Sequence, residues 1–240
     1  MNLYVTGTDT EIGKTLVAAA LLHALRGAGC SAHGFKPVAS GATATDNPDV
    51  EALRVAASPG LGPALINRYR FTAPIAPHIA AAEAGVEIDI AALREDIGHS
   101  RAEVRVIEGF GGWLAPLGPR SMQAELARAC ECRVVLVVGM RLGCLNHALL
   151  SADRIRRDGL ELAGWVANRV DPSMRRFEAN LQTLCERLQA PRLGSVPHLE
   201  PATPAAAAGY LDVRSLLATG GLRAGAGAPG RRDSAFPADG

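Results

Sequence analysis

Short runs of apolar residues alternate along the chain with longer segments in which apolar residues recur every three or four positions. Each run predicts a strand that is buried on both faces, and the runs cover residues 3–5, 33–38, 104–107, 134–138 and 162–167. The periodic segments predict helices over residues 13–27, 89–101, 121–130, 144–157 and 173–188. This alternation predicts an α/β fold in which helices cover both faces of a parallel sheet, giving three layers.

Two parts of the chain lack this regular pattern. Residues 58–85 contain several prolines, so we expect loops and a short helix over the sheet rather than a second domain. From residue 220 the composition changes to Gly, Ala, Pro and Arg without periodicity, which predicts a disordered tail over residues 220–240. Residues 1–219 are therefore expected to form a single domain.

Composition and charge exclude several classes of partner. The chain is 48% hydrophobic, enough for a sizeable core, and its net charge of +1 gives no reason to expect nucleic acid or an anionic membrane. No apolar run is long enough to span a membrane, and the first residues predict a strand rather than a signal peptide. We expect a cytoplasmic protein with no nucleic-acid or membrane partner. Its five cysteines lack a second Cys or His pair for a zinc site, so we assign them no metal or redox role.

Lysine is rare in this chain. Of the 25 basic residues, only Lys14 and Lys36 are lysines, and both lie in glycine-rich segments. Because arginine serves everywhere else, the two lysines indicate places where a compact ammonium group must reach into a tight anionic pocket.

The segment from Gly7 to Thr15 joins the first predicted strand to the first predicted helix. A strand, a glycine-rich turn and Gly-Lys-Thr at a helix start bind phosphate through backbone N–H groups, the lysine and a threonine that binds Mg²⁺. Five residues separate Gly7 from Gly13, whereas the usual spacing is four. Because this glycine-rich segment joins the first strand to the first helix, nucleotide binding is favoured over a plain capped turn. The segment therefore predicts a P-loop NTPase-like sheet.

Several segments together resemble dethiobiotin synthetase. They are residues 7–15 (GTDTEIGKT), 36–41 (KPVASG) and 108–113 (EGFGGW). Residues 137–148 are similar to the substrate-helix segment of that family, and residues 163–168 are similar to its adenine-side strand. The segments keep the order of the family as far as about residue 217.

The resemblance implies an ATP- and Mg²⁺-dependent ligase of biotin biosynthesis. Its substrates would be 7,8-diaminopelargonic acid and CO₂ or bicarbonate. One amine would take up CO₂ to give a carbamate, and the carbamate would attack the γ-phosphate. The second amine would then attack the carbamic–phosphoric anhydride and close the ureido ring, giving dethiobiotin, ADP and phosphate.

The resemblance also implies roles for particular residues. Lys14 and Lys36 would be catalytic, with Lys14 on the β- and γ-phosphates and Lys36 on the carbamate and the γ-phosphate. The residues implied to bind ATP are Thr10, Glu11, Ile12, Gly13, Lys14, Thr15, Leu16, Glu108, Gly109, Gly111, Asn168, Pro197 and Leu199. Among them Asn168 would read the adenine between Pro197 and Leu199.

Three oxygen-bearing side chains are the implied ligands of Mg²⁺: Thr15, Asp49 and Glu108. Mg²⁺ prefers hard oxygen ligands and usually takes one or two carboxylates with phosphate oxygens and waters. Glu108 follows an apolar strand and precedes glycines, which suits a metal ligand. Asp49 has a plainer interpretation as a helix N-cap.

The implied substrate residues are Ser40, Gly143, Cys144, Leu145 and Asn146. The last four open a helix whose N-terminal amides could receive the carboxylate of the diamine. In the family this helix comes from the partner subunit, so the resemblance implies a homodimer whose substrate site is completed across the interface. The plainer interpretations are an ordinary turn at Ser40 and an ordinary helix start.

The chain departs from the family pattern at three places. Phe110 stands where the family commonly has alanine, and Asn180 replaces an expected tyrosine. Arg169 and residues 195–200 also differ around the nucleotide. These departures bear on substrate affinity and nucleotide preference more than on the type of reaction.

Other functions remain open for a phosphate loop. A switch ATPase of the partitioning or septum-positioning class shares the fold but carries an extra lysine early in the loop, and residues 7–12 contain none. A glutamine-dependent amide synthetase would need a fused amidotransferase domain. A paralogue that acts on a different diamine or amino acid is the third alternative.

Overall fold

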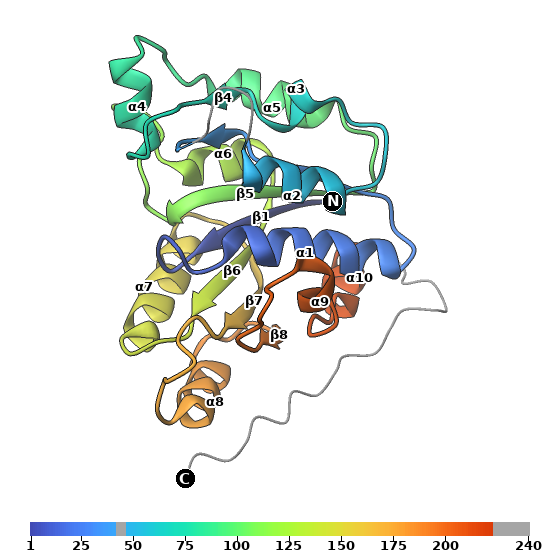
Figure 1. Cartoon of the computed structure of the whole chain (residues 1–240), viewed down its shortest axis with the longest axis vertical. Helices are drawn as coiled ribbons and strands as arrows, with labels where there is room; N and C mark the ends of the chain where they lie inside the picture. The colour runs from blue at the N-terminus through green and yellow to red at the C-terminus, as the bar shows by residue number, and fades with distance from the viewer. Residues whose placement is uncertain (42–46, 223–240) are drawn as a thin grey trace.

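A six-stranded sheet forms the centre of the computed structural model, which describes residues 1–41 and 47–222 (Figure 1). Its strands lie in the order β2-β5-β1-β6-β7-β8, and every neighbouring pair is parallel. Their bounds are β1 (Asn2–Gly7), β2 (Ala32–Phe35), β5 (Val104–Gly112), β6 (Arg133–Gly139), β7 (Leu162–Asn168) and β8 (Arg192–Val196). The predicted parallel α/β sheet is confirmed.

Helices cover both faces of this sheet because alternate residues of each strand are buried against different layers. On β1, Leu3 and Val5 pack in one hydrophobic cluster while Tyr4 packs in the other. The first layer contains α1 (Lys14–Gly27), α2 (Pro48–Ala56), α9 (Pro204–Ala208) and α10 (Arg214–Thr219). The second contains α4 (Pro77–Glu83), α5 (Ile90–Gly98), α6 (Gln123–Ala129), α7 (Cys144–Arg157) and α8 (Phe177–Arg187).

The strand expected over residues 33–38 is wrong at its C-terminal end. It leaves the main sheet after Phe35, and the N–H of Lys36 donates to the carbonyl of Ile66 at 2.9 Å. Pro37 has no N–H to continue a ladder. The chain then forms β3 (Val38–Ala39), which pairs in a separate two-stranded sheet with β4 (Tyr69–Arg70). Lys36 is thereby placed at the carboxyl edge of the main sheet.

The irregular region contains slightly more structure than the single short helix that we expect from the sequence. It holds α3 (Pro63–Ile66), β4 and α4. Residues 220–222, where the predicted tail begins, are hydrogen-bonded to the end of α10. The remainder of that tail, residues 223–240, lies outside the described residues. In the part of the chain that the structure describes, no helix combines the length and the apolar character that crossing a membrane requires.

Candidate active site

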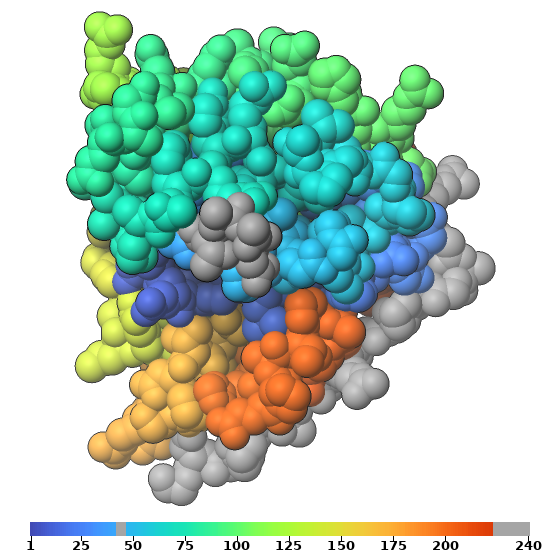
Figure 2. Space-filling view, turned by 45° about the horizontal axis from the view of Figure 1, so that its top comes forward, coloured from blue at the N-terminus to red at the C-terminus, as the bar shows by residue number. Residues whose placement is uncertain are grey.

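A pocket of about 440 Å³ lies where the carboxyl ends of β1, β2 and β5 meet. Ligands of open α/β sheets bind at this edge. In Figure 2 the phosphate loop (dark blue) lies at the surface between the teal upper part of the molecule and its yellow and orange lower part. The pocket is lined by Thr10, Glu11, Gly13, Lys14, Thr15, Lys36, Val38, Ala39, Ser40, Asp49, Glu108, Phe110 and Gly111.

The phosphate loop turns into α1 through two residues with left-handed backbone, Glu11 (φ 55) and Gly13 (φ 80). A Cβ atom at Gly13 would lie 2.3 Å from Nδ2 of Asn168, so this turn requires glycine. Asn168 donates to the carbonyl of Ile12 at 2.8 Å and ties the loop to the end of β7. The first turn of α1 therefore opens into the pocket, where its free N–H groups suit an anion.

Lys14 and Lys36, the only two lysines, line this one pocket. Nζ of Lys14 donates to the carbonyl oxygen of Asp9 at 2.6 Å. Burial, together with the nearby charge of Lys36, lowers the pKa of Lys14 to about 8. Burial also acts to lower the pKa of Lys36, but Glu108 and Asp49 outweigh it and raise that pKa. Glu108, Asp9 and Asp49 oppose this shift only in part, and a bound polyphosphate would add further negative charge beside Lys14.

The three implied Mg²⁺ ligands lie together around Lys36. Its Nζ is 2.5 Å from Oε1 of Glu108 and 3.2 Å from Oδ2 of Asp49. The hydroxyl of Thr15 donates to the same Oε1 of Glu108 at 2.7 Å. Burial raises the pKa of the Glu108 carboxyl group, and the charge of Lys36 opposes this shift.

A hard cation fits this group of oxygens. Oε2 of Glu108 is buried without a hydrogen-bond partner among the described residues, so it is free to take a ligand. No set of three or more His, Cys, Asp or Glu side chains gathers into a metal cage in residues 1–41 and 47–222. A Mg²⁺ ion bound here would complete its shell with phosphate oxygens and waters, as it commonly does.

The N-cap interpretation of Asp49 is wrong. Helix α2 is capped by Asn47, whose Oδ1 accepts from the N–H groups of Asp49 (2.9 Å) and Val50 (3.2 Å). The carboxylate of Asp49 is consequently directed to Lys36 instead of to its own helix.

The remaining predicted nucleotide residues lie outside the pocket. Ile12 is buried, and Leu16 and Leu199 pack against the hydrophobic cluster beneath α1. Asn168 pairs in register with Val196, so Pro197 follows β8 at the same edge of the sheet. Gly109 adjoins the pocket, because its carbonyl oxygen lies 3.5 Å from Nζ of Lys36.

Of the predicted substrate residues, the structure brings only Ser40 into the pocket of its own chain. Gly143 (φ 96) is the N-cap of α7 and precedes the other three. Leu142 beside it is 96% exposed, and Asn146 is exposed. The side chain of Asn180 donates to the carbonyl of Arg176, the N-cap of α8, and the guanidinium of Arg169 lies over the ring of Phe177 at 4.9 Å.

Two contacts of the site are not predictable from sequence patterns. Arg141 forms an ion pair with Asp9 of the phosphate loop, and this links the loop to the start of α7. The side chain of Gln123 is fully buried and bonds to the backbone that follows Glu108. Gln123 belongs to no recognisable motif, and the segment 137–148 that contains Arg141 gives no sign of its pairing with Asp9. Both residues act through contacts between distant parts of the chain.

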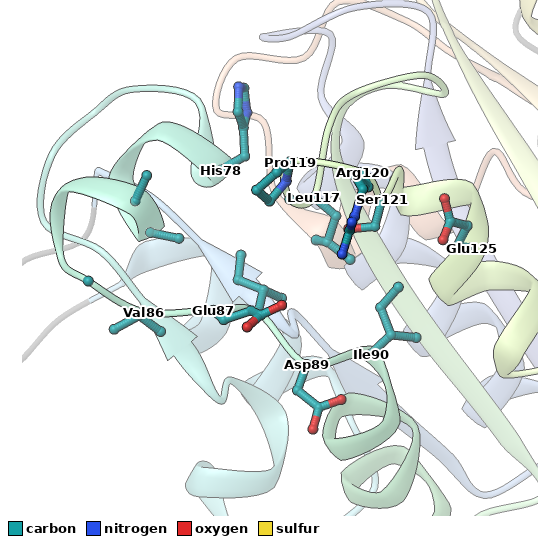
Figure 3. A pocket seen from close by; sticks show the side chains of 15 residues that line it. His78, Val86, Glu87, Asp89, Ile90, Leu117, Pro119, Arg120, Ser121 and Glu125 are labelled. Atoms are coloured by element: carbon teal, nitrogen blue, oxygen red, sulfur yellow. The ribbon is translucent and has the colours of Figure 1, made fainter.

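A second cavity, of about 1040 Å³, lies between α4, the α4–α5 connection and the β5–α6 connection. Figure 3 shows the side chain of Arg120 reaching into it from one side and Glu87 facing it from another, while the ring of His78 points away. It contains none of the predicted nucleotide or metal residues. The phosphate site is therefore a separate and smaller pocket.

Comparisons with known proteins show which family the chain belongs to. Residues 1–206 match the AAA domain family. The chain is 54% identical over 220 residues to the ATP-dependent dethiobiotin synthetase BioD of Pseudomonas aeruginosa (strain UCBPP-PA14), covering 89% of this chain and 96% of that one. It is 52% identical over 214 residues to the protein of the same name from Aromatoleum aromaticum (87% and 95% covered).

Solved structures show the same fold at lower identity. The MinD cell division protein of Aquifex aeolicus aligns with a TM-score of 0.52 at 16% identity, covering 85% of this chain and 86% of that chain. The MinC:MinD complex from the same organism gives a TM-score of 0.54 at 14% identity, covering 87% and 92%. These likenesses establish a P-loop NTPase fold, and the much higher identity to the synthetases establishes the family. The chain belongs to the ATP-dependent dethiobiotin synthetases, which are ligases.

Proposed function

We propose that this chain uses MgATP to carboxylate 7,8-diaminopelargonic acid with CO₂ or bicarbonate and closes the ureido ring to give dethiobiotin, ADP and phosphate. The observation that carries this proposal is the convergence of Lys14, Lys36, Thr15, Asp49 and Glu108 on one pocket. The family membership supplies the substrates, and the pocket supplies the groups that phosphoryl transfer needs.

The reaction divides into three bond-forming steps. One amine of the diamine forms an N–C bond to CO₂ and loses a proton, giving a carbamate. A carbamate oxygen then attacks the γ-phosphorus of ATP, and the bond to the ADP oxygen breaks. The second amine finally attacks the carbamoyl carbon and expels phosphate, which closes the ring. Because this last step is intramolecular, orientation of the bound diamine contributes much of its rate.

The two lysines would stabilise negative charge on different parts of the reacting groups. Lys14 would contact the β- and γ-phosphates from the start of α1. Lys36, which its two carboxylates keep protonated, would hold the carbamate oxygen and the transferring phosphoryl group. Thr15, Asp49 and Glu108 would hold Mg²⁺, which neutralises charge on the phosphates when bound. Positioned charges of this kind act most strongly where water is excluded.

The nucleotide base would lie against the end of β7. Because Nδ2 of Asn168 already donates to Ile12, its carboxamide oxygen is left to accept from the amino group of adenine. Pro197, at the same sheet edge, would flank the base.

We propose a homodimer in which α7 of each copy completes the pocket of the other. Exposed apolar side chains support this, because monomers rarely leave many of them together. Among the described residues, the large exposed apolar side chains are Val55, Ile75, Ile79, Val86, Leu114, Met122, Leu142 and Leu150. Most of them lie on or beside α4 and α7, which are on the same side of the molecule in Figure 1. The exposed start of α7 would then present Gly143–Asn146 to the carboxylate of the diamine.

The decisive experiment measures phosphate release from MgATP and bicarbonate with and without 7,8-diaminopelargonic acid, and detects dethiobiotin by mass. We expect release that depends on the diamine, with product formed in equal amount. Tight ATP binding without diamine-dependent turnover would contradict the proposal and would favour a changed substrate or a switch ATPase.

A further inference from the structure

Strand β5 contains a bulge that faces the phosphate pocket. Its register with β1 runs as far as the pair Val5–Glu108 and resumes at the pair Gly7–Gly112. The three residues between them, 109–111, stand opposite Thr6 alone. Bulges of this kind leave backbone groups without ladder partners and re-aim the strand beside active sites. Phe110 and Gly111 of this bulge line the pocket that contains Lys14 and Lys36.

The carboxamide of Gln123, at the start of α6, takes the place of the missing strand partner. Its Oε1 accepts from the N–H of Phe110 at 3.2 Å. Its Nε2 donates to the carbonyl of Phe110 at 2.8 Å and also to the carbonyl of Gly112. The backbone donor and acceptors determine which end of the amide faces which group. One side chain therefore satisfies two backbone groups of the bulge and the carbonyl of Gly112, the residue that follows it.

The Gln123 side chain is itself held in place from β1. The hydroxyl of Tyr4 donates to its Oε1 at 3.0 Å, and both residues are almost completely buried. A Cβ atom at Gly109 would lie 2.3 Å from Oε1 of Gln123 and 2.9 Å from Cε1 of Tyr4. Glycine at this position thus lets the bulge pack directly on the pair. A buried polar pair inside an apolar cluster is costly unless fully bonded, and here the bulge completes its bonding.

We propose that Gln123 is a positioning residue for the γ-phosphoryl end of the pocket. The bulge begins directly after Glu108, and the carbonyl of Gly109 lies beside Nζ of Lys36. Gln123 therefore sets the position of the backbone that faces the transferring group, while the base and the inner phosphates bind elsewhere. The inference rests on the proposed function in one respect, which is that Lys36 binds the γ-phosphoryl group of ATP.

The test compares triphosphate with diphosphate binding in the Gln123→Leu variant. We expect the affinity for a non-hydrolysable MgATP analogue to fall about ten-fold, because the bulge loses its bonds to the side chain. The affinity for MgADP should change less than about two-fold, because ADP does not reach the bulge. Gln182→Leu, at an exposed position of α8, is the matched control and should leave both affinities unchanged.

Tyr4→Phe is the second variant in case Gln123→Leu does not fold. It removes only the hydroxyl that orients the carboxamide, so we expect a smaller loss of ATP affinity, about three-fold, again without loss of ADP affinity. Equal losses for both nucleotides, or no loss for either, would overturn the proposal. Because both measurements omit the diamine, they remain decisive even if the proposed carboxylation fails.

Discussion

Lys14 and Lys36 lie in one pocket, yet their surroundings shift their pKa values in opposite directions. Lys36 is flanked by two carboxylates, which raise its pKa despite burial. Lys14 is buried beside the charge of Lys36, and its closest partner is the neutral carbonyl of Asp9. The pocket without nucleotide therefore holds Lys14 at a cost in stability, which a bound phosphate would remove.

Replacing Lys14 by methionine should stabilise the nucleotide-free protein while abolishing nucleotide binding. At pH 7 we expect the free energy of unfolding to rise on the order of 3 kcal/mol, from the lowered pKa of Lys14. Between pH 8 and the ordinary lysine pKa of 10.5, the unfolded chain binds more protons than the folded one, so wild-type stability rises with pH.

Denaturant unfolding at pH 7 and pH 10 measures both effects. The advantage of Lys14→Met should shrink between these two values, because the folded wild type then carries a neutral Lys14. A difference between the two proteins that stays constant with pH would show that the charge of Lys14 is not the cause.

Replacing Lys36 by alanine should abolish turnover and leave nucleotide binding largely intact. We expect kcat to fall by at least about 10². The Kd for MgADP should stay within a few-fold of the wild-type value, because Lys14 and the phosphate loop are unchanged. Steady-state kinetics and equilibrium titration separate the two quantities. Activity within a few-fold of wild type would remove Lys36 from the mechanism.

Most residues of the phosphate site are predictable from the sequence because they belong to continuous motifs. The loop from Gly7 to Thr15 and the segments around Lys36 and Glu108 each contain their own turn and strand signals. Gln123 has no such signal, since its role depends on a bulge in β5 and on Tyr4 of β1. Such contacts between distant segments are set by tertiary structure alone.

At the scale of elements, the missed parts are short or depend on distant pairing. The strand expected to reach Val38 stops at Phe35, because Val38 pairs instead with Tyr69. Strand β8 is absent from the predicted strands. It is only five residues long, and it contains Gly194, where a Cβ atom would lie 2.1 Å from the carbonyl oxygen of Tyr210. The predicted helices also omit α2, although it begins with Asn47-Pro48, an N-cap and a first-turn proline.

The cap of α2 provides a test of how this helix serves the site. Asn47→Ala removes the acceptor for two N–H groups and should cost about 1 kcal/mol of stability. Because α2 carries Asp49 toward Lys36, we also expect a higher Mg²⁺ concentration for half-maximal activity. Thr203→Ala removes the comparable cap of α9 and is the matched control. A similar Mg²⁺ shift in both variants would indicate general loosening instead.

At the scale of the whole molecule, the exposed side of α4 and α7 has no counterpart in the sequence pattern. In the sequence, Leu142 is not distinguishable from an apolar residue of the core. In the folded chain its side chain is 96% exposed. The same fold places the predicted substrate residues Gly143–Asn146 outside the pocket that holds Ser40. A second copy that covers this side would account for both observations.

Mixed dimers test whether each pocket is completed by the other copy. Lys36→Ala disables the pocket, and Asn146→Pro removes one of the backbone N–H groups at the start of α7, so each variant alone should be strongly impaired. In a mixed dimer, one site combines an intact Lys36 with an intact Asn146 of the partner subunit, and the other site lacks both. Random assembly makes about half of the dimers mixed with one working site each, which predicts about a quarter of wild-type activity after co-expression. Activity that merely averages the two variants would contradict a site shared between subunits.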